Sequence, residues 1–194
     1  MTIHGVVPDW TNAGTVPPIR PGAAGSSQDR SPYQVGVAHF CEQFGTTQER
    51  RHILNGFLDF RLELHNAGLV EGFQWLDGSF LERVELTEQR APRDIDIVTF
   101  LELPANDTQA TLLGRAPQLF DQSRLKKDYN VDAYFSVLGQ RLGSSMVRQI
   151  AYWYSMWSHR RDGLWKGFVQ VNLAPDDDTF ARQLIVDKGG VDHG

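Results

Sequence analysis

The most distinctive pattern in the chain is Trp75-Leu76-Asp77-Gly78-Ser79-Phe80, followed by Asp94-Ile95-Asp96-Ile97-Val98. A Gly-Ser pair ends one apolar run, and two carboxylates stand at alternate positions in the next. Because side chains alternate between the faces of a strand, Asp94 and Asp96 are expected on one face, with Cα atoms roughly 6.6 Å apart. Two carboxylates so placed can converge on a divalent cation, and a Gly-Ser turn can offer backbone N–H groups to a phosphate. The pattern therefore predicts a metal and nucleotide site.

Length and composition limit the class of protein. A chain of 194 residues is long enough for one domain with a substantial core. A net charge of −5 argues against a uniformly basic nucleic-acid-binding surface and still allows a local basic groove. The single cysteine, Cys41, excludes an intrachain disulfide and a cysteine-based zinc site. Without an apolar run of membrane-spanning length or a secretory signal in residues 1–20, the expected location is cytoplasmic, with no membrane partner.

The chain divides into three parts. Residues 1–30 are rich in Pro, Gly and Ser, and we expect an extended or partly disordered N-terminal segment. Its apolar residues leave open an ordered strap along the domain; they are Val6, Val7, Trp10 and Ile19. The folded domain is expected over 31–188, and a frayed tail over 189–194.

Apolar periodicity predicts helices and strands in alternation after residue 31. The expected helices are 32–43, 46–67, 117–128 and 142–158, with a weaker signal at 178–186. The expected strands are 70–76, 94–103, 131–137 and 167–173, with a charged insertion at 82–93. This pattern indicates an α/β (α+β) fold in which helices pack on a small mixed sheet.

A third carboxylate is expected beside the first two. Asp132 lies within the otherwise apolar strand 131–137, where an unpaired charge would be costly. Nucleotidyl transfer uses divalent cations to align the attacking oxygen and to neutralise a triphosphate, and carboxylates are the usual ligands of Mg²⁺. The sequence therefore predicts that Asp94, Asp96 and Asp132 are catalytic and bind Mg²⁺ (or Mn²⁺).

These residues resemble the motif of the nucleotidyltransferase superfamily, which includes DNA polymerase β, poly(A) polymerases and minimal bacterial nucleotidyltransferases. That motif is Gly-Ser after an apolar residue, then Asp-x-Asp in a strand, then an acidic residue on an adjacent strand. The resemblance implies that Gly78 and Ser79 hold a nucleoside triphosphate while Asp94, Asp96 and Asp132 bind two metal ions. The chain departs from the family in one respect: fourteen residues separate Ser79 from Asp94, somewhat more than the family norm.

A closer likeness covers most of the chain. The segments that carry it include Pro8-Asp9-Trp10, Arg30-Ser31-Pro32-Tyr33, residues 72–80 and Lys166-Gly167. They look like an uncharacterised bacterial family that is nucleotidyltransferase-like. The likeness implies the fold and no particular substrate. At superfamily level it implies a monophosphate transferred to a protein, RNA/tRNA or nucleotide acceptor, in a toxin-antitoxin or antiphage defence setting.

Further residues are weaker candidates. Basic residues after the core can contact the triphosphate or the acceptor, and Arg148 and Lys166 are assigned to the nucleotide; the others are Arg141, Arg160 and Arg161. The aromatic residues of 142–158 fit core packing better than base stacking, because they follow helical spacing. Lys126 and Lys127 are explained by the charge at a helix C-terminus, and Asp77 by capping of the next segment.

Two alternatives to an enzyme stay open at this point. One is a catalytically inactive module that binds a nucleotide or a partner protein on the same fold. The other is a structural or partner-regulated subunit that uses the N-terminal segment and exposed aromatics as an interface, with a partner protein or as a homo-oligomer. The presence of all three acidic positions favours the enzyme.

Overall fold

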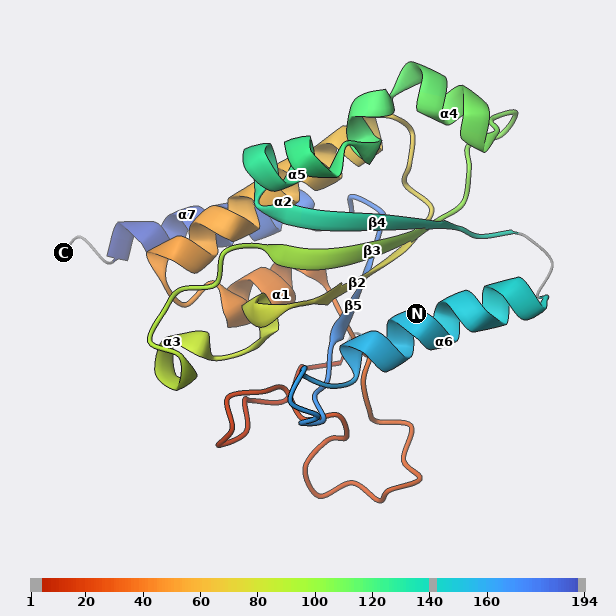
Figure 1. Ribbon diagram of the computed structural model, residues 1–194. Helices are drawn as coiled ribbons and strands as arrows, with labels where there is room; N and C mark the ends of the chain where they lie inside the picture. The colour runs from red at the N-terminus through yellow and green to blue at the C-terminus, as the bar shows by residue number, and fades with distance from the viewer. Residues whose placement is uncertain (1–4, 140–142, 192–194) are drawn as a thin grey trace.

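The computed structural model describes residues 5–139 and 143–191 and contains a five-stranded mixed sheet (Figure 1). The strand order is β1-β5-β2-β3-β4. Strands β1 and β5 are parallel, as are β3 and β4, whereas β2 runs antiparallel to both β3 and β5. The strands are β1 (Tyr33–Val35), β2 (Gly72–Asp77), β3 (Ile95–Leu101), β4 (Val131–Val137) and β5 (Val169–Asn172). The predicted α/β (α+β) class with a small mixed sheet is confirmed.

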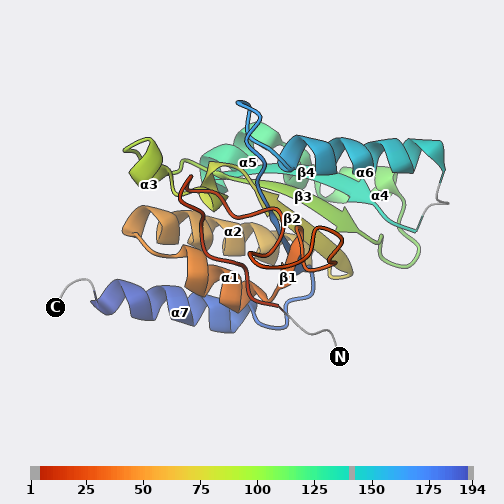
Figure 2. The ribbon, with the colours of Figure 1, turned by 90° about the horizontal axis from the view of Figure 1, so that it is seen from below.

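Helices cover both faces of the sheet. In Figure 2, α1, α2 and α7 lie on one side of the sheet and α6 lies on the other. The helices are α1 (Val37–Phe44), α2 (Gln48–Asn66), α3 (Val84–Thr87), α4 (Gln109–Arg115), α5 (Gln122–Tyr129), α6 (Ser144–Trp157) and α7 (Asp178–Val191), with 3₁₀ turns η1 (Ser79–Leu81) and η2 (Pro117–Phe120). Within residues 5–139 and 143–191, none of the helices combines the length and apolar character needed to cross a membrane.

The two faces of the sheet differ in character. On the α2 face, Thr99 accepts a hydrogen bond from Gln74, which in turn accepts one from the fully buried Arg61 of α2. On the opposite face, aromatic rings pack from Trp75 through Phe168 to Trp157 of α6. Because side chains alternate along β3, Asp96 shares the α6 face and not the α2 face.

Arg61 ties α2 to the segment that leads into α7. Its guanidinium makes an ion pair with Asp178 at 2.7 Å and donates to the carbonyls of Asn172, Leu173 and Ala174. Arginine has five donors in a planar fork, so these acceptors together satisfy a charge that is fully buried. These contacts account for the burial of Arg61, so its burial does not by itself indicate a functional site.

Several predicted elements need correction. The segment 32–43 was predicted to be a single helix, but its residues 33–35 form strand β1, which pairs with β5. Helix α1 starts only at Val37. Helix α4 was not predicted, and the predicted helix 117–128 is divided into η2 and α5. The weak helix signal at 178–186 underestimates α7, which continues to Val191; residues 192–194 of the predicted tail lie outside the described residues.

The N-terminal strap, defined here as residues 5–30, is ordered along the domain. Val7 and Val16 are each 1% exposed. Backbone amides from distant segments donate to the strap: Gly167 N to Val16 O at 2.7 Å, and Arg83 N to Gly14 O at 2.7 Å. Of the two forms that the sequence allows for this segment, the structure shows the ordered strap.

Candidate active site

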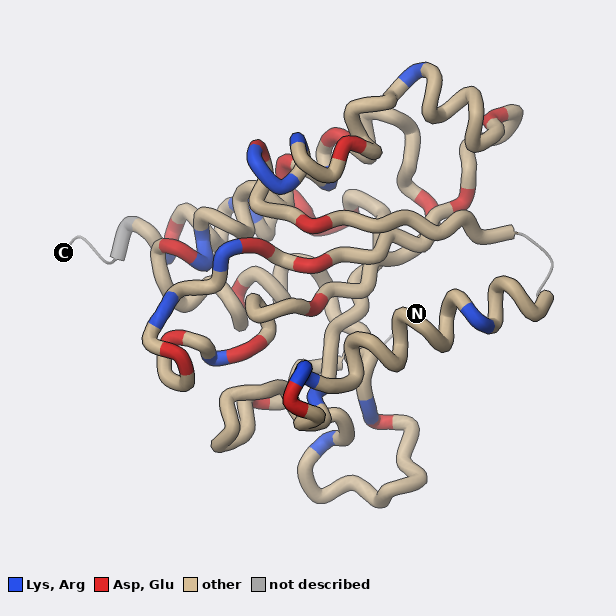
Figure 3. Tube along the Cα trace, viewed as in Figure 1, with Lys and Arg blue, Asp and Glu red and all other residues tan. Residues whose placement is uncertain are grey.

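Four carboxylates gather at one end of the sheet. Asp96 on β3 is directly opposite Asp77 on β2 and Asp132 on β4. Residues opposite one another on neighbouring strands share a face, and Asp94 joins that face two positions before Asp96. Figure 3 shows acidic positions side by side near the same ends of β2, β3 and β4. The structure therefore brings together the three acids that the sequence singles out and adds a fourth, Asp77.

The Gly78-Ser79 turn lies against this row. Gly78 has φ 85° and ψ −171°, a conformation that side-chain-bearing residues rarely adopt. A Cβ atom at Gly78 would lie 2.6 Å from Oδ2 of Asp96. Only glycine therefore allows the turn to approach the carboxylate so closely, and Ser79 follows as the first residue of η1.

An open cleft of about 1060 Å³ lies over the carboxylates. Its acidic floor is Asp77, Asp94, Asp96 and Asp132, and its basic residues are Arg90, Arg93, Lys126, Arg160, Arg161 and Lys166. Gly78, Ser79, Tyr134 and Trp157 also line it. A cleft with acids on its floor and cations around them suits a metal-bound polyphosphate.

The carboxylates repel one another. Burial, together with the charges of Asp94 and Asp132, raises the pKa of Asp96 to about 6, while the charges of Lys166 and Lys126 oppose the rise. Burial also raises the pKa of Tyr134, whose hydroxyl faces Asp132. The raised pKa of Asp96 reflects its burial and repulsion among the carboxylates, and a bound cation would reduce that repulsion.

Lys126 of α5 contacts two of the four carboxylates. Its Nζ lies 2.6 Å from Oδ2 of Asp94 and 3.7 Å from Oδ2 of Asp132. The hydrogen bond to Asp94 raises the pKa of Lys126. Lys126 and Lys127 do lie in the last turn of α5, as predicted, but the helix C-terminus does not account for the contacts of Lys126 with the acids.

A buried cluster of ion pairs includes Asp77, one of the four carboxylates of the row. Nζ of Lys166 lies 3.0 Å from Asp77 and 2.9 Å from Glu82, and the Lys166 side chain is 6% exposed. Burial lowers the pKa of Lys166, and the two carboxylates raise it by more. Arg160 lies 3.3 Å from the second oxygen of Glu82. Asp77 thus pairs with Lys166, and η1 has no side-chain cap, so the predicted capping role of Asp77 is wrong.

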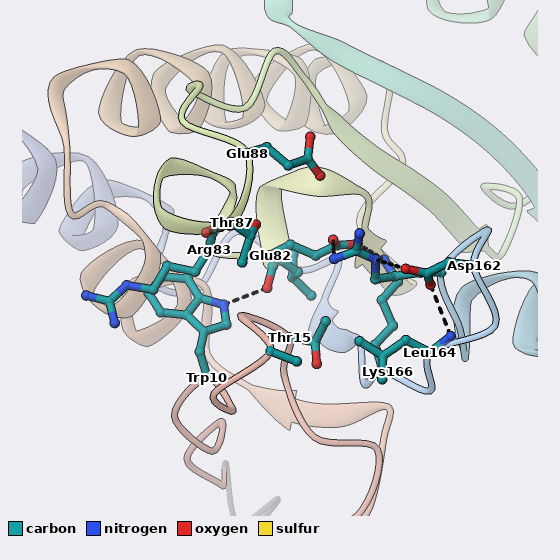
Figure 4. Close-up of polar contacts among 12 residues, drawn as sticks. Trp10, Thr15, Glu82, Arg83, Thr87, Glu88, Asp162, Leu164 and Lys166 are labelled. Atoms are coloured by element: carbon teal, nitrogen blue, oxygen red, sulfur yellow. Dashed lines mark hydrogen bonds and ion pairs between the residues drawn. The ribbon is translucent and has the colours of Figure 1, made fainter.

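The N-terminal strap braces the segment after the Gly-Ser turn (Figure 4). The indole N–H of Trp10 donates to the carbonyl of Leu81 at 2.7 Å, and its ring lies under the guanidinium of Arg83. Arg50 of α2 donates to the carbonyls of Phe80 and Glu82, both at 2.6 Å. The main chain that carries Ser79 and Glu82 is therefore held from two sides.

The remaining predicted site residues lie elsewhere or have other partners. Arg148 is exposed on α6 and is not among the residues that line the cleft, so its predicted nucleotide contact stays a prediction without support from this geometry. Lys166 does line the cleft, but its two carboxylate partners favour a structural role. Arg141 lies outside the described residues.

The aromatic residues of α6 divide between core and surface. Trp153 and Trp157 are 8% and 3% exposed, which confirms core packing for these two, whereas Tyr152 and Tyr154 are 57% and 37% exposed. Cys41 is buried, as expected of a cysteine that packs as an apolar residue.

The donors fit Mg²⁺ or Mn²⁺, although the carboxylates as they stand are not converged. Among the described residues, no group of three or more His, Cys, Asp or Glu side chains is placed to hold a metal ion. The ammonium of Lys126 lies within ion-pair distance of two of the acids, Asp94 and Asp132. Hard oxygen donors, their mutual repulsion and the close glycine turn are the features that suit a hydrated dication beside a phosphate.

Three of the residues in this site escaped the sequence-based prediction. Asp77 ends an apolar run and was predicted to be a cap, Glu82 belongs to the charged insertion, and Lys126 was explained by its helix. The one available signal was the position of Asp77, because an acid at the end of a buried strand requires a partner. The partner itself, Lys166, is far away in sequence.

Residues 8–172 match the model of a family described as a family of unknown function, DUF6932, and the chain belongs to that family. Neither the curated proteins nor the solved structures contain a match to the chain.

Proposed function

We propose that this member of DUF6932 is a metal-dependent nucleotidyltransferase that moves a nucleoside monophosphate from a nucleoside triphosphate to a hydroxyl acceptor. The observation that carries the proposal is the alignment of Asp96 with Asp132 in the sheet register, with Asp94 on the same face and Gly78 against the Asp96 carboxylate. These features come from separate segments of the chain and meet in one cleft. The resemblance to the nucleotidyltransferase superfamily supports the same assignment.

Each residue has a distinct part in the proposed reaction. Asp94, Asp96 and Asp132 would hold Mg²⁺ or Mn²⁺, which when bound supplies charge neutralisation for the triphosphate and its leaving group. The Ser79 hydroxyl and the backbone N–H groups of the turn bind phosphate oxygens. Asp132 accepts the proton of the acceptor hydroxyl, whose oxygen forms a bond to the α-phosphorus. The bond from the α-phosphorus to the bridging oxygen breaks, and pyrophosphate leaves.

The test is label transfer from each α-³²P-labelled NTP and dNTP, with Mg²⁺ or Mn²⁺ and a cell lysate as the source of acceptor. We expect Asp96→Asn to lower transfer by about 100-fold or more, because the substitution removes a charged metal ligand. Asp162→Asn is the matched control, since Asp162 lines the same cleft outside the carboxylate row. Equal transfer by wild type and Asp96→Asn would refute the proposal. A label on protein, on RNA or on a small product identifies the acceptor.

One observation favours the second candidate, a catalytically inactive nucleotide-binding module. Lys126 already neutralises Asp94, as a cation would. Such a module would bind a nucleoside triphosphate, measured by calorimetry, without releasing pyrophosphate from it, whatever acceptor is offered. Pyrophosphate release that depends on Asp96 excludes it.

A further inference from the structure

Lys126 lines the cleft and contacts its carboxylates, yet it has no part in the proposed reaction. It lies in the last turn of α5, with Nζ within 2.6 Å of Asp94 and 3.7 Å of Asp132. Its side chain is 56% exposed. The lysine is therefore in contact with the floor of the cleft while more than half of its side-chain surface is in solvent, so the side chain can change partners while the fold stays intact.

The neighbouring Lys127 shows that helix position does not explain this contact. Both lysines lie in the last turn of α5, where the helix dipole favours a positive charge. Among the described residues, Lys127 has no ion-pair partner, whereas Lys126 has two. The difference lies in the carboxylates: α5 leads directly into β4, which brings Lys126 over Asp132.

We propose that Lys126 is an exchangeable counter-ion: it binds Asp94 and Asp132 when metal is absent, and it binds the triphosphate when a metal–triphosphate complex occupies the cleft. The inference rests on the proposed function and concerns the regulation of the same site. It means that the cleft binds free metal weakly and the metal–triphosphate complex strongly.

The chemistry of the groups requires this competition. The ammonium of Lys126 and a divalent cation both bind the oxygens of Asp94, so the presence of one lowers the affinity of the carboxylate for the other. A triphosphate supplies several anionic oxygens to a lysine that has lost its carboxylates, and lysine on a flexible stem is a common phosphate ligand. Ser79 and Gly78 line the same cleft as Lys126, so a triphosphate bound at this turn and the carboxylates would both lie in the cleft that Lys126 enters.

The experiment compares wild type, Lys126→Gln and the matched control Lys127→Gln by isothermal titration calorimetry. Two probes are titrated separately: Mn²⁺ alone, and inorganic triphosphate in saturating Mg²⁺, which makes the result independent of the base. We expect Lys126→Gln to bind Mn²⁺ about fivefold more tightly and Mg²⁺–triphosphate about fivefold more weakly than wild type, the size of one partly exposed ion pair. Lys127→Gln should match wild type for both probes.

Opposite shifts in Lys126→Gln alone support the exchange. Identical shifts in Lys127→Gln overturn it, because net charge then explains the effect. Tighter Mn²⁺ binding with unchanged triphosphate affinity also overturns it, since the lysine would then serve the carboxylates only. Lys126→Arg should keep both wild-type affinities within about twofold, as it retains the charge. If wild type binds neither probe, the proposed function fails; if all variants bind both equally, only this inference fails.

Discussion

Glycine at position 78 is the residue on which the geometry of the cleft depends most directly. Alanine there must adopt φ 85° and would place Cβ 2.6 Å from Asp96. We expect Gly78→Ala to lower the free energy of unfolding by about 1–3 kcal/mol, measured in urea, and to abolish label transfer. Gly22→Ala is the control, because Gly22 has φ 83° with nothing within 4 Å of the added Cβ. If both variants lose transfer equally, backbone strain and not the collision is responsible.

Lys166 tests the buried ion cluster. Removing its charge leaves Asp77, whose side chain is 4% exposed, without its cation, and leaves Glu82, 10% exposed, with Arg160 alone. Breaking a buried pair in this way costs about 3–5 kcal/mol, so Lys166→Met should destabilise the protein by that amount in urea. The double variant Asp77→Asn/Lys166→Met should lose less than the sum of the two single variants. Additive losses would show that the two side chains do not interact.

At the scale of single residues, the sequence indicates the acids but not their partners. Asp94, Asp96 and Asp132 were recognisable because alternation along a strand and an acid in an apolar run are local patterns. Asp77 was not, because its place beside Asp96 depends on the register between β2 and β3. Register is decided by packing between strands, which no short segment records.

Helices α2 and α5 are joined by a polar contact that depends on pH. Glu63 accepts hydrogen bonds from Arg124 at 2.8 Å and from Tyr129 at 2.6 Å. The hydrogen bond from Arg124 holds the pKa of Glu63 below its usual value. A lowered folded-state pKa gives stability that is complete above the unfolded pKa and is lost as pH falls through the folded pKa.

We expect Glu63→Gln to lower the free energy of unfolding by only about 1 kcal/mol at pH 7, because the pair is partly exposed. The loss should become progressively smaller as the pH falls below about 4.5 and Glu63 becomes protonated. Urea unfolding of both proteins from pH 7 to pH 3 measures the difference. Glu71→Gln is the control, since Glu71 is exposed. A Glu63→Gln penalty that stays constant with pH would contradict the assignment.

The N-terminal strap is the second element that can be tested. Trp10 packs edge-on against Phe44, 5.6 Å between ring centroids, and donates to Leu81. We expect Trp10→Ala to cost about 2–3 kcal/mol, less than a fully buried tryptophan, and Trp10→Phe to cost about 1 kcal/mol through the lost hydrogen bond. Urea unfolding measures both. A strap that contributes nothing would leave the two variants as stable as wild type.

Long periodic elements were predictable and short ones were not. The helix over 46–67 corresponds to α2, which Ala67 and Gly68 end as expected. Strand β1 is three residues long and exists because β5 supplies its hydrogen bonds, so propensity alone assigned it to a helix. Helix α4 begins with a capping box at Thr108, a signal that the flanking turn residues obscured.

For the whole molecule, the sheet order β1-β5-β2-β3-β4 was not predictable, since it places the last strand of the chain between the first two. That order is nevertheless what brings Lys166, just before β5, within 3.0 Å of Asp77 at the end of β2. The carboxylate row and its supporting cluster therefore come from different levels of information: local patterns give Asp94, Asp96 and Asp132, and topology gives Asp77 and its partner Lys166.

Clustered acids should cost the whole molecule stability when metal is absent. Asp96 is largely buried and is repelled by Asp94 and Asp132, so its neutral isostere should relieve the fold. We expect Asp96→Asn in EDTA at pH 7.5 to raise the free energy of unfolding by about 1 kcal/mol, measured in urea, whereas Asp162→Asn should not. Saturating Mg²⁺ should stabilise wild type, by about 2.7 kcal/mol at a metal concentration 100 times Kd, and stabilise Asp96→Asn much less. The order of stability of the two proteins should therefore reverse when metal is added; an order that stays the same would mean that the acids of this cleft are not held together for a cation.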